Sequence, residues 1–245
     1  GAQILDVLSG ITFNGNLDLE VTDITNFDTR IDRFFEKNQI ISLSAFYKKM
    51  KNPIELTRYS SDDDNVQPIN TPYGKVFGLE FEIRKALDFI FDGLFVNMNN
   101  SLIYSEVEIT GDEESSVLNS LRDGEEFSPI RQMQGQAPFI LNLSLSYIKD
   151  KFDVGLFYNV EGEKLSIVGI NRRPNIYSSP FHSINLNFST YLNNDKSLKL
   201  SLLSKNLLNQ KREFYAKSYG IEDQIYSSFL SGRTFSFKLS YKLNN

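Results

Sequence analysis

Apolar and polar residues alternate with a period of two along six segments of this chain. In each segment one phase holds only apolar or aromatic residues, and the interleaved phase is mostly Ser, Asn, Gly, Glu or Lys. Because successive side chains of a β-strand point to opposite faces, this pattern predicts strands with one hydrophobic face and one polar face. The six segments are residues 41–47, 77–83, 139–147, 154–160, 184–188 and 235–243.

Three weaker segments bring the predicted total to nine strands, at residues 25–35, 94–107 and 198–208. Most of the nine reach about 10 to 14 residues. Strands of soluble proteins are usually about 5 to 6 residues long, whereas a tilted strand that crosses a membrane needs about 9 to 11. Their length therefore favours strands that cross a membrane.

The connections between these strands alternate between short and long. The short ones are residues 36–38, 86–93, 149–150 and 193–196, and the long ones are residues 51–73, 108–135, 161–181 and 209–231. Outer-membrane barrels have short periplasmic turns and long extracellular loops. We therefore predict an all-β fold, an antiparallel transmembrane β-barrel segment of about nine strands. Residues 24–245 form the barrel part, and residues 1–23 begin on the outer side.

The two faces of the predicted strands then meet different solvents. The apolar phase contains no Lys or Arg, as a lipid-facing surface requires, and aromatic residues mark its outer end (Tyr47, Phe139, Tyr158, Phe235) and its inner end (Tyr147, Tyr241). The polar phase would line the lumen, where we expect Glu80, Glu82, Arg84, Asn142, Asn185, Asn187 and Lys238. A soluble sandwich of two sheets would bury the same apolar residues between its layers and is the structural alternative.

Nine strands cannot close by themselves into the even-numbered barrel of a bacterial outer-membrane protein. Unpaired strand edges in hydrocarbon cost several kcal/mol per backbone group. We therefore expect this chain to be incomplete alone, as a fragment of a longer protein or one part of a split barrel. It begins Gly1-Ala2-Gln3, so any signal peptide is expected to lie outside it.

The composition excludes several classes of function. A net charge of -5 is the wrong sign for a nucleic-acid-binding protein. With no Cys, disulfides, thiolate metal sites and Cys nucleophiles are absent. The single histidine, His182, adjoins Ser183, but neighbouring strand residues point to opposite faces and cannot form a nucleophile-base pair. We predict no catalytic residue, metal ion or cofactor.

Candidate solute contacts lie in the third and fourth long connections, which carry charge and aromatic rings. They are Arg172, Arg173, Tyr177, Tyr215, Tyr219 and Tyr226. Two acidic runs, residues 62–64 and 112–114, could hold a hard cation through oxygen ligands. Neither has the spacing of a calcium-binding loop, so we expect solvated loop charge there.

Several short motifs occur in an order that is similar to one known family. They are Asn16-Leu17, then ITNFD at 24–28, AFYK at 45–48 leading into KNPIE at 51–55, GLE at 78–80, RQMQGQAP at 131–138, KNLL at 205–208 and GRTFS at 232–236. Together they resemble the C-terminal barrel portion of TonB-dependent outer-membrane transporters, of the kind common in Bacteroidota-like bacteria. Two features depart from the family pattern: no proline accompanies Asn16, and the chain ends Leu243-Asn244-Asn245 instead of on an aromatic residue.

The resemblance implies a 22-stranded barrel in the bacterial outer membrane, of which this chain supplies the last nine strands. It implies active import of a large solute through a barrel filled by a plug, on which the TonB complex pulls. The expected partners are the rest of the barrel and the plug, the TonB complex, outer-membrane lipid and a surface lipoprotein. An assembly or secretion barrel and a soluble all-β binding module or adhesin remain as alternatives, and glycans, peptides and iron chelates all remain open as solutes.

Overall fold

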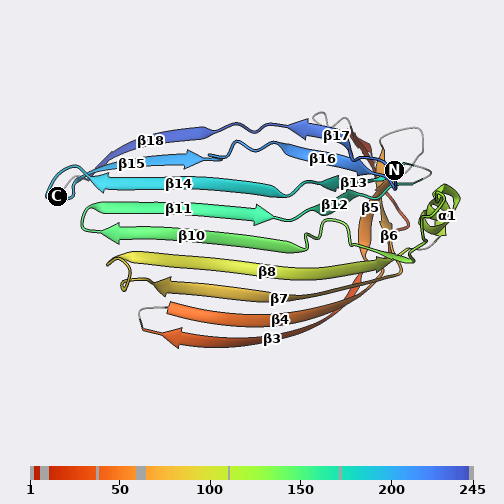
Figure 1. Ribbon diagram of the computed structural model, residues 1–245, viewed down its shortest axis with the longest axis horizontal. Helices are drawn as coiled ribbons and strands as arrows, with labels where there is room; N and C mark the ends of the chain where they lie inside the picture. The colour runs from red at the N-terminus through yellow and green to blue at the C-terminus, as the bar shows by residue number, and fades with distance from the viewer. Residues whose placement is uncertain are drawn as a thin grey trace.

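A single curved sheet, the wall sheet, makes up most of the molecule (Figure 1). The computed structural model describes residues 3–5, 11–36, 39–58, 65–109, 111–170 and 173–242. Nine antiparallel strands follow one another across the wall sheet in the order β18-β15-β14-β11-β10-β8-β7-β4-β3, and the short β9 (Ile130–Arg131) pairs with β8. Their bounds are β3 Asp23–Phe35, β4 Gln39–Lys51, β7 Tyr73–Ala86, β8 Leu94–Glu108, β10 Phe139–Lys149, β11 Phe152–Glu161, β14 Phe181–Tyr191, β15 Leu198–Lys205 and β18 Thr234–Tyr241.

The nine predicted strands are these nine strands, and neighbours in the sequence are neighbours in the sheet. One strand, β15, is clearly shorter than predicted, because it stops at Lys205 instead of continuing to Leu208. Asn206 and Asn209 adopt left-handed backbone conformations, with φ of 54° and 50°, and asparagine tolerates this region better than most residues. The asparagines therefore end the strand before its apolar pattern ends.

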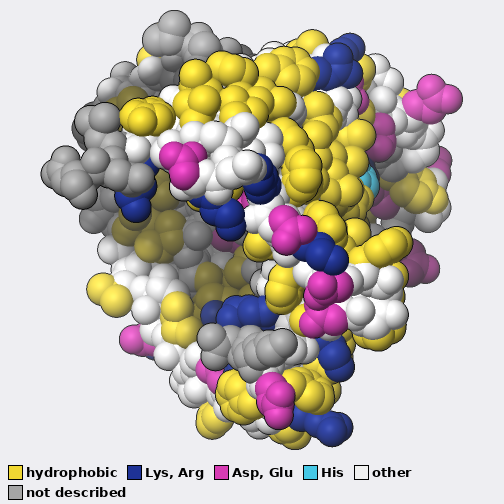
Figure 2. All heavy atoms as spheres, turned by 90° about the vertical axis from the view of Figure 1, so that its left-hand side faces the viewer, with side chains coloured by type: hydrophobic (Ala, Val, Ile, Leu, Met, Phe, Trp, Pro, Cys, Tyr) yellow, Lys and Arg dark blue, Asp and Glu magenta, His cyan; other side chains and the backbone are white. Residues whose placement is uncertain are grey.

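The wall sheet is a single layer with two different faces. Large hydrophobic side chains such as Leu43, Leu79, Leu156 and Phe237 remain between 42% and 69% exposed along one face. Polar side chains occupy the alternate positions, which the register places together on the other face. Figure 2, seen from the end with the short turns, shows hydrophobic side chains gathered in a band along one side of the molecule. Among the described residues, no second layer covers the hydrophobic face, so the two-layer sandwich is not the fold.

The long connections, predicted above only as loops, form two small sheets and a helix. The first small sheet has the order β1-β2-β6-β5, with β1 Gln3–Leu5, β2 Thr12–Asn14, β6 Val66–Asn70 and β5 Ile54–Arg58. The second has the order β12-β13-β16-β17, with β12 Lys164–Ile167, β13 Asn175–Ser178, β16 Arg212–Lys217 and β17 Gln224–Phe229. The helix is α1, Gly111–Ser120. Both sheets and α1 lie at one end of the molecule, the long-loop end (Figure 1).

The second small sheet continues the wall sheet after a short break. Its order β12-β13-β16-β17 repeats the order β11-β14-β15-β18 of the strands from which its strands extend. The breaks fall at residues 162–163, 179–180, 206–211 and 230–233, which include Gly162, Pro180 and Gly232. The four strands of the second small sheet therefore extend this part of the wall sheet at the long-loop end.

The most deeply buried hydrophobic residues gather at the long-loop end, in the small sheets and at the end of β8, instead of along the middle of the wall. They include Val66, Val107, Leu165, Val168 and Ile176, each 2% exposed or less. No helix within the described ranges is long and apolar enough to cross a membrane. The molecule therefore combines a one-layer wall with a small packed core at one end.

Candidate functional site

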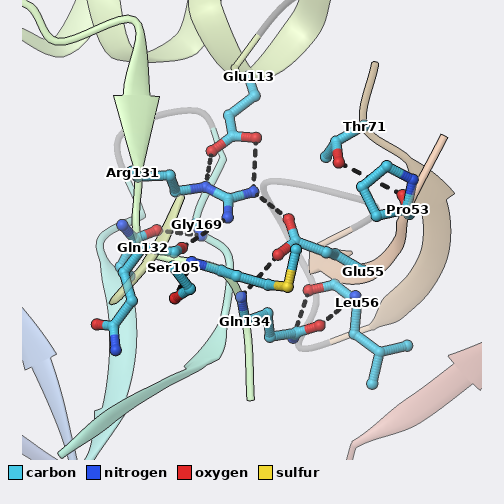
Figure 3. A network of polar contacts seen from close by, with 12 residues as sticks. Pro53, Glu55, Leu56, Thr71, Ser105, Glu113, Arg131, Gln132, Gln134 and Gly169 are labelled. Atoms are coloured by element: carbon cyan, nitrogen blue, oxygen red, sulfur yellow. Dashed lines mark hydrogen bonds and ion pairs between the residues drawn. The ribbon is translucent and has the colours of Figure 1, made fainter. Parts of the chain in front are cut away.

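A network of buried ionic contacts holds the long-loop end together (Figure 3). Its centre is Arg131 on β9, which the register places opposite Val107 of β8. The Arg131 guanidinium donates hydrogen bonds to Glu55 of β5 at 2.7 Å and to Glu113 of α1 at 2.9 Å, with a second, shorter bond to Glu113. The three side chains are only 11%, 2% and 8% exposed. One cation therefore joins the wall, the first small sheet and the helix.

Arg131 remains charged in this environment. Burial lowers its pKa, but the hydrogen bonds with Glu113 and the negative charge of Glu55 raise it more, and the pKa ends above the ordinary value for arginine. Two carboxylates around one guanidinium also leave the cluster with a formal charge of −1. Such a cluster is stable only while every charged group keeps its partners, because an unpaired buried charge is costly.

Gln134 extends the network from Arg131 towards both small sheets. Its side-chain amide donates to the carbonyl oxygens of Leu56 at 2.8 Å and Ser166 at 2.7 Å, and its backbone N–H donates to Glu55 at 2.6 Å. Next to it, the N–H of Gly135 donates to Leu165 at 2.8 Å. The RQMQGQ segment thus bonds backbone groups of β5 and β12, which are edge strands of the two small sheets.

A polar cavity of about 540 Å³ adjoins this network. The loop after α1 forms one side of the cavity, and β9, the approach to β13 and the tip of the β16–β17 hairpin form the others. Charged and polar side chains dominate the lining, including Ser116, Arg122, Glu125, Arg173, Lys217 and Tyr219. We call this cavity the polar cleft. Its mixture of cations, carboxylates, hydroxyls and one aromatic ring suits a polar solute and offers no nucleophile-base pair.

Tyr219, at the tip of the β16–β17 hairpin, forms hydrogen bonds with the loop after α1 on the other side of the polar cleft. Its hydroxyl donates a 3.0 Å hydrogen bond to the carbonyl oxygen of Gly124, and its own carbonyl oxygen accepts a short bond from Arg122. These contacts join residues that lie 95 or more positions apart in the sequence. On another wall, Lys217 is held by Glu163 at 2.6 Å and by the face of Tyr177 at 5.0 Å.

The structure brings together only some of the predicted solute contacts. Arg173 and Tyr219 line the polar cleft. The other three tyrosines have other partners. The ring of Tyr177 contacts Lys217, and the hydroxyl of Tyr215 donates to Glu213 at 2.7 Å. The ring of Tyr226 packs against Arg58. The hydrogen bond to Glu213 also raises the pKa of Tyr215 above its ordinary value. Arg172 lies outside the described residues.

Sequence reasoning missed Arg122, Arg131 and Lys217. Arg131 belongs to the RQMQGQAP motif, which served above only as a landmark of the family. Arg122 and Lys217 belong to no recognisable sequence motif, and only the fold brings them to one cavity.

The predicted lumen residues lie on the polar face and fall into two groups. Glu82 forms ion pairs with Arg30 of β3 at 2.8 Å and with Arg84 at 3.3 Å, and Ser44 donates to Glu80 at 3.3 Å. The second group is amide-rich: a hollow of about 360 Å³ is lined by Asn97, Asn99, Asn142, Asn159, Asn185 and Ser144, among others. Asn187 follows Asn185 along the polar face of β14, and Lys238 lies on β18 opposite Ser201.

The remaining candidates acquire ordinary structural partners. Of the two acidic runs, residues 62–64 lie outside the described part of the chain, and residues 112–114 form the first turn of α1, where Glu113 binds Arg131. No group of three or more potential metal ligands occurs among the residues that the structure describes. His182 lies 2.7 Å from the hydroxyl of Tyr158, with which it shares a hydrogen bond.

The geometry agrees with what comparison with known proteins finds. Residues 3–207 match the family described as TonB dependent receptor-like, beta-barrel, and the chain belongs to this family. Its members are outer-membrane β-barrel proteins, so the hydrophobic face of the wall sheet contacts the outer membrane. No curated protein matches the chain.

Solved structures of receptors and transporters share the fold. A mutant ferric enterobactin receptor (PfeA) of Pseudomonas aeruginosa superposes with a TM-score of 0.57 at 19% identity, over 94% of this chain and 32% of that one. The copper transporter OprC gives 0.60 at 15% identity, over 92% and 33%. The ferric-catecholate import receptor Fiu of E. coli K12 gives 0.57 at 11% identity, over 92% and 28%. This chain therefore spans about a third of the length of the proteins it resembles.

Proposed function

We propose that this chain is the C-terminal barrel wall of a TonB-dependent active transporter that imports a large solute across the outer membrane. Membership of the family supports this role, and the single observation that carries it furthest is the polar cleft at the extracellular end. Arg122, Arg173 and Tyr219 line a cavity that is open to solute at the end where an importer must first bind it. Arg172, Tyr177, Tyr215 and Tyr226 would contribute to the same extracellular surface.

The mechanism requires no covalent chemistry. The solute binds at the extracellular surface, and a plug inside the barrel moves when the TonB complex pulls on it. The lumen residues Glu80, Glu82, Arg84, Asn142, Asn185, Asn187 and Lys238 then form part of the wet surface along which the solute and plug move. Buried ion pairs at Arg131 keep the cleft walls in place while the plug shifts.

The partners follow from the same proposal. The free edges of β3 and β18 pair with the remaining strands of a 22-stranded barrel, and residues 24–245 supply its last nine strands, with residues 1–23 on the outer side. The plug, the TonB complex and a surface lipoprotein complete the assembly. The RQMQGQAP segment and the other ordered motifs support a Bacteroidota-like source.

The test is an uptake experiment with the full-length protein. Cells that lack the gene are grown on a panel of glycans, peptides and iron chelates, each as the sole source of its nutrient, and are complemented with wild type or with Arg122→Ala/Tyr219→Ala. We expect growth on one solute class to be lost in the deletion strain and in a strain without TonB. The double variant should restore this growth only weakly. Full restoration by the double variant would remove the polar cleft from the proposal, and growth that is independent of TonB would overturn active import.

A further inference from the structure

The polar face of the wall sheet differs between its two halves. On β3, β4 and β7 it carries charges that pair with each other, as Glu82 does with Arg30 and Arg84. On β8, β10, β11 and β14, two adjacent rows of cross-strand partners carry no charge. The first row is Asn99, Asn142, Asn159 and Ser183, and the second is Asn97, Ser144, Phe157 and Asn185. We call these eight residues the amide rows.

The amide rows surround the hollow of about 360 Å³ on this face. Its volume lies within the roughly 300 to 1,000 Å³ that is usual for small-molecule sites. Among the described residues that line it, Lys205 of β15 is the one charged residue. The hollow therefore offers a solute a surface that is polar but almost neutral.

Charges border the amide rows, and most of them are already paired. On β7 the rows continue to Glu82 and Arg84, which neutralise each other at 3.3 Å. In the next row towards the long-loop end, Glu161 pairs with Lys164 at 2.6 Å. Asp153 of β11 lies two rows away towards the short turns. A charged solute in the hollow would therefore find few counter-ions.

The amide side chains have spare hydrogen-bonding capacity. A side-chain amide can donate two hydrogen bonds and accept two. Asn159 donates to Asn142 at 2.6 Å, and Asn97 donates to Ser144 at 3.3 Å. Asn99 makes no side-chain hydrogen bond within the described part of the chain. Most of the donors and acceptors of these amides are therefore available to a solute.

Phe157 adds an apolar surface in the middle of the amide rows. Its ring leans over Gly155 of the same strand, where an added Cβ atom would lie only 2.8 Å from the ring. Because glycine has no side chain, the ring has room to lie close to the backbone of the wall. Phe157 is 38% exposed, whereas Gly155 is buried. The hollow therefore combines neutral hydrogen-bonding groups with an exposed aromatic ring.

We propose that the amide rows form a binding subsite for a neutral oligosaccharide inside the barrel, an inference that rests on the proposed role in import. A sugar hydroxyl both donates and accepts, and a side-chain amide offers a donor and an acceptor side by side. The C–H face of a sugar ring packs against the apolar ring of Phe157. An anionic chelate, or a peptide with charged ends, would lose hydration and find no opposite charge within the amide rows.

Native mass spectrometry of the full-length protein in detergent tests this subsite. The neutral probes are maltohexaose, mannohexaose and xylohexaose, and the charged probes are hexagalacturonate and an unblocked hexapeptide. We expect a neutral probe to bind best, and Asn99→Leu/Asn142→Leu to bind it about tenfold more weakly, because each lost amide removes neutral hydrogen bonds. Phe157→Leu should also weaken binding, whereas Phe157→Tyr keeps the ring and should bind nearly as well as wild type.

Asn26→Leu is the matched control. It removes the same amide from the charged half of the polar face, where Asn26 donates to Asp28, and it should leave sugar binding unchanged. Heat-modified migration on gels checks that each variant is a folded barrel. Equal weakening by Asn26→Leu, full binding by Asn99→Leu/Asn142→Leu, or tighter binding of a charged probe than of every neutral one would overturn the proposal.

The growth experiment on the nutrient panel separates this inference from the proposed function. Growth that depends on TonB for an iron chelate or a peptide, and not for a neutral glycan, would overturn the sugar subsite and leave active import in place. Asn99→Leu/Asn142→Leu should impair growth on the neutral glycan alone. Equal loss of every solute that needs TonB would show that the amide rows hold the plug instead, and would also overturn the subsite.

Discussion

The wall sheet and the long-loop end are stabilised by different physical interactions. In the wall, consecutive strands of the nine pair with each other, and one face carries mostly hydrophobic side chains. At the long-loop end, segments distant in the sequence meet, and polar side chains such as Arg131 and Gln134 make the connections. The wall therefore depends on the period of its sequence and on lipid. The long-loop end depends on a few specific buried contacts, so single substitutions should affect the two regions in different ways.

Replacing Arg131 should have the largest effect, and it should be confined to the long-loop end. Arg131→Met leaves Glu55 and Glu113 buried without a cation, and breaking a buried ion pair in this way costs about 3 to 5 kcal/mol. We expect faster hydrogen exchange and proteolysis in β5, α1 and β9 while the wall strands remain protected. Arg30→Met is the control, because the Arg30 side chain is 45% exposed on the polar face of the wall and its loss should have a much smaller effect. Equal effects of the two substitutions would contradict the distinction.

A charge placed on the lipid face should have the next largest effect, and this time on the wall. Leu143→Arg should destabilise the folded barrel by about 2 to 4 kcal/mol, because Arg is poorly solvated at the middle of a bilayer. Ser144→Arg, one residue further along β10, should be far milder, because Ser144 lies on the polar face, where its hydroxyl accepts a 3.3 Å hydrogen bond from Asn97. The measurement is the folding free energy of the full-length barrel in lipid vesicles. Similar values for the two variants would show that the assigned faces are wrong.

These two regions also differ in how far the sequence predicts them. The wall could be predicted because alternation is a local property: the segment from Phe139 to Tyr147 shows its two faces without reference to any other segment. The four short turns and the nine-strand order follow from the same local pattern together with the connection lengths.

The polar cleft could not be predicted in the same way. Arg122 and Tyr219 are 97 residues apart, and their contact depends on how the β16–β17 hairpin and the loop after α1 pack together. The strands of the small sheets are only 3 to 6 residues long, too short for alternation to identify them. Tyr219 and Arg173 were predicted from their chemistry alone. Tyr215 and Tyr226, chosen for the same reason, face other partners.

Replacing Gln134 should have an intermediate effect at the long-loop end. Gln134→Leu keeps a side chain of similar size but removes the amide that donates to the carbonyl oxygens of Leu56 and Ser166 and accepts from the Leu56 N–H. An unsatisfied buried polar group costs about 1 to 3 kcal/mol. Hydrogen exchange of β5 and β12 measures the loss. Gln224→Leu on exposed β17 is the matched control and should be nearly neutral. Protection of β5 equal to that of wild type would mean that Gln134 does not connect the small sheets.

Removing one hydroxyl from the polar cleft should have the smallest effect. Tyr219→Phe loses the hydrogen bond to the carbonyl oxygen of Gly124, and a single neutral hydrogen bond contributes about 0.5 to 1.5 kcal/mol. The loss should appear as faster hydrogen exchange in residues 121–126, without change in the wall strands or in β5.

Tyr226→Phe provides the control for this substitution, because the Tyr226 hydroxyl makes no hydrogen bond with the described residues, and its ring contact with Arg58 survives the change. Hydrogen exchange in residues 121–126 could prove equally slow in Tyr219→Phe and Tyr226→Phe. In that case the short bond from Arg122 to the carbonyl oxygen of Tyr219 holds the two walls together without the hydroxyl. The Arg122 side chain would then join the two walls through the backbone of residue 219, and the ring of Tyr219 would be free to contact a solute.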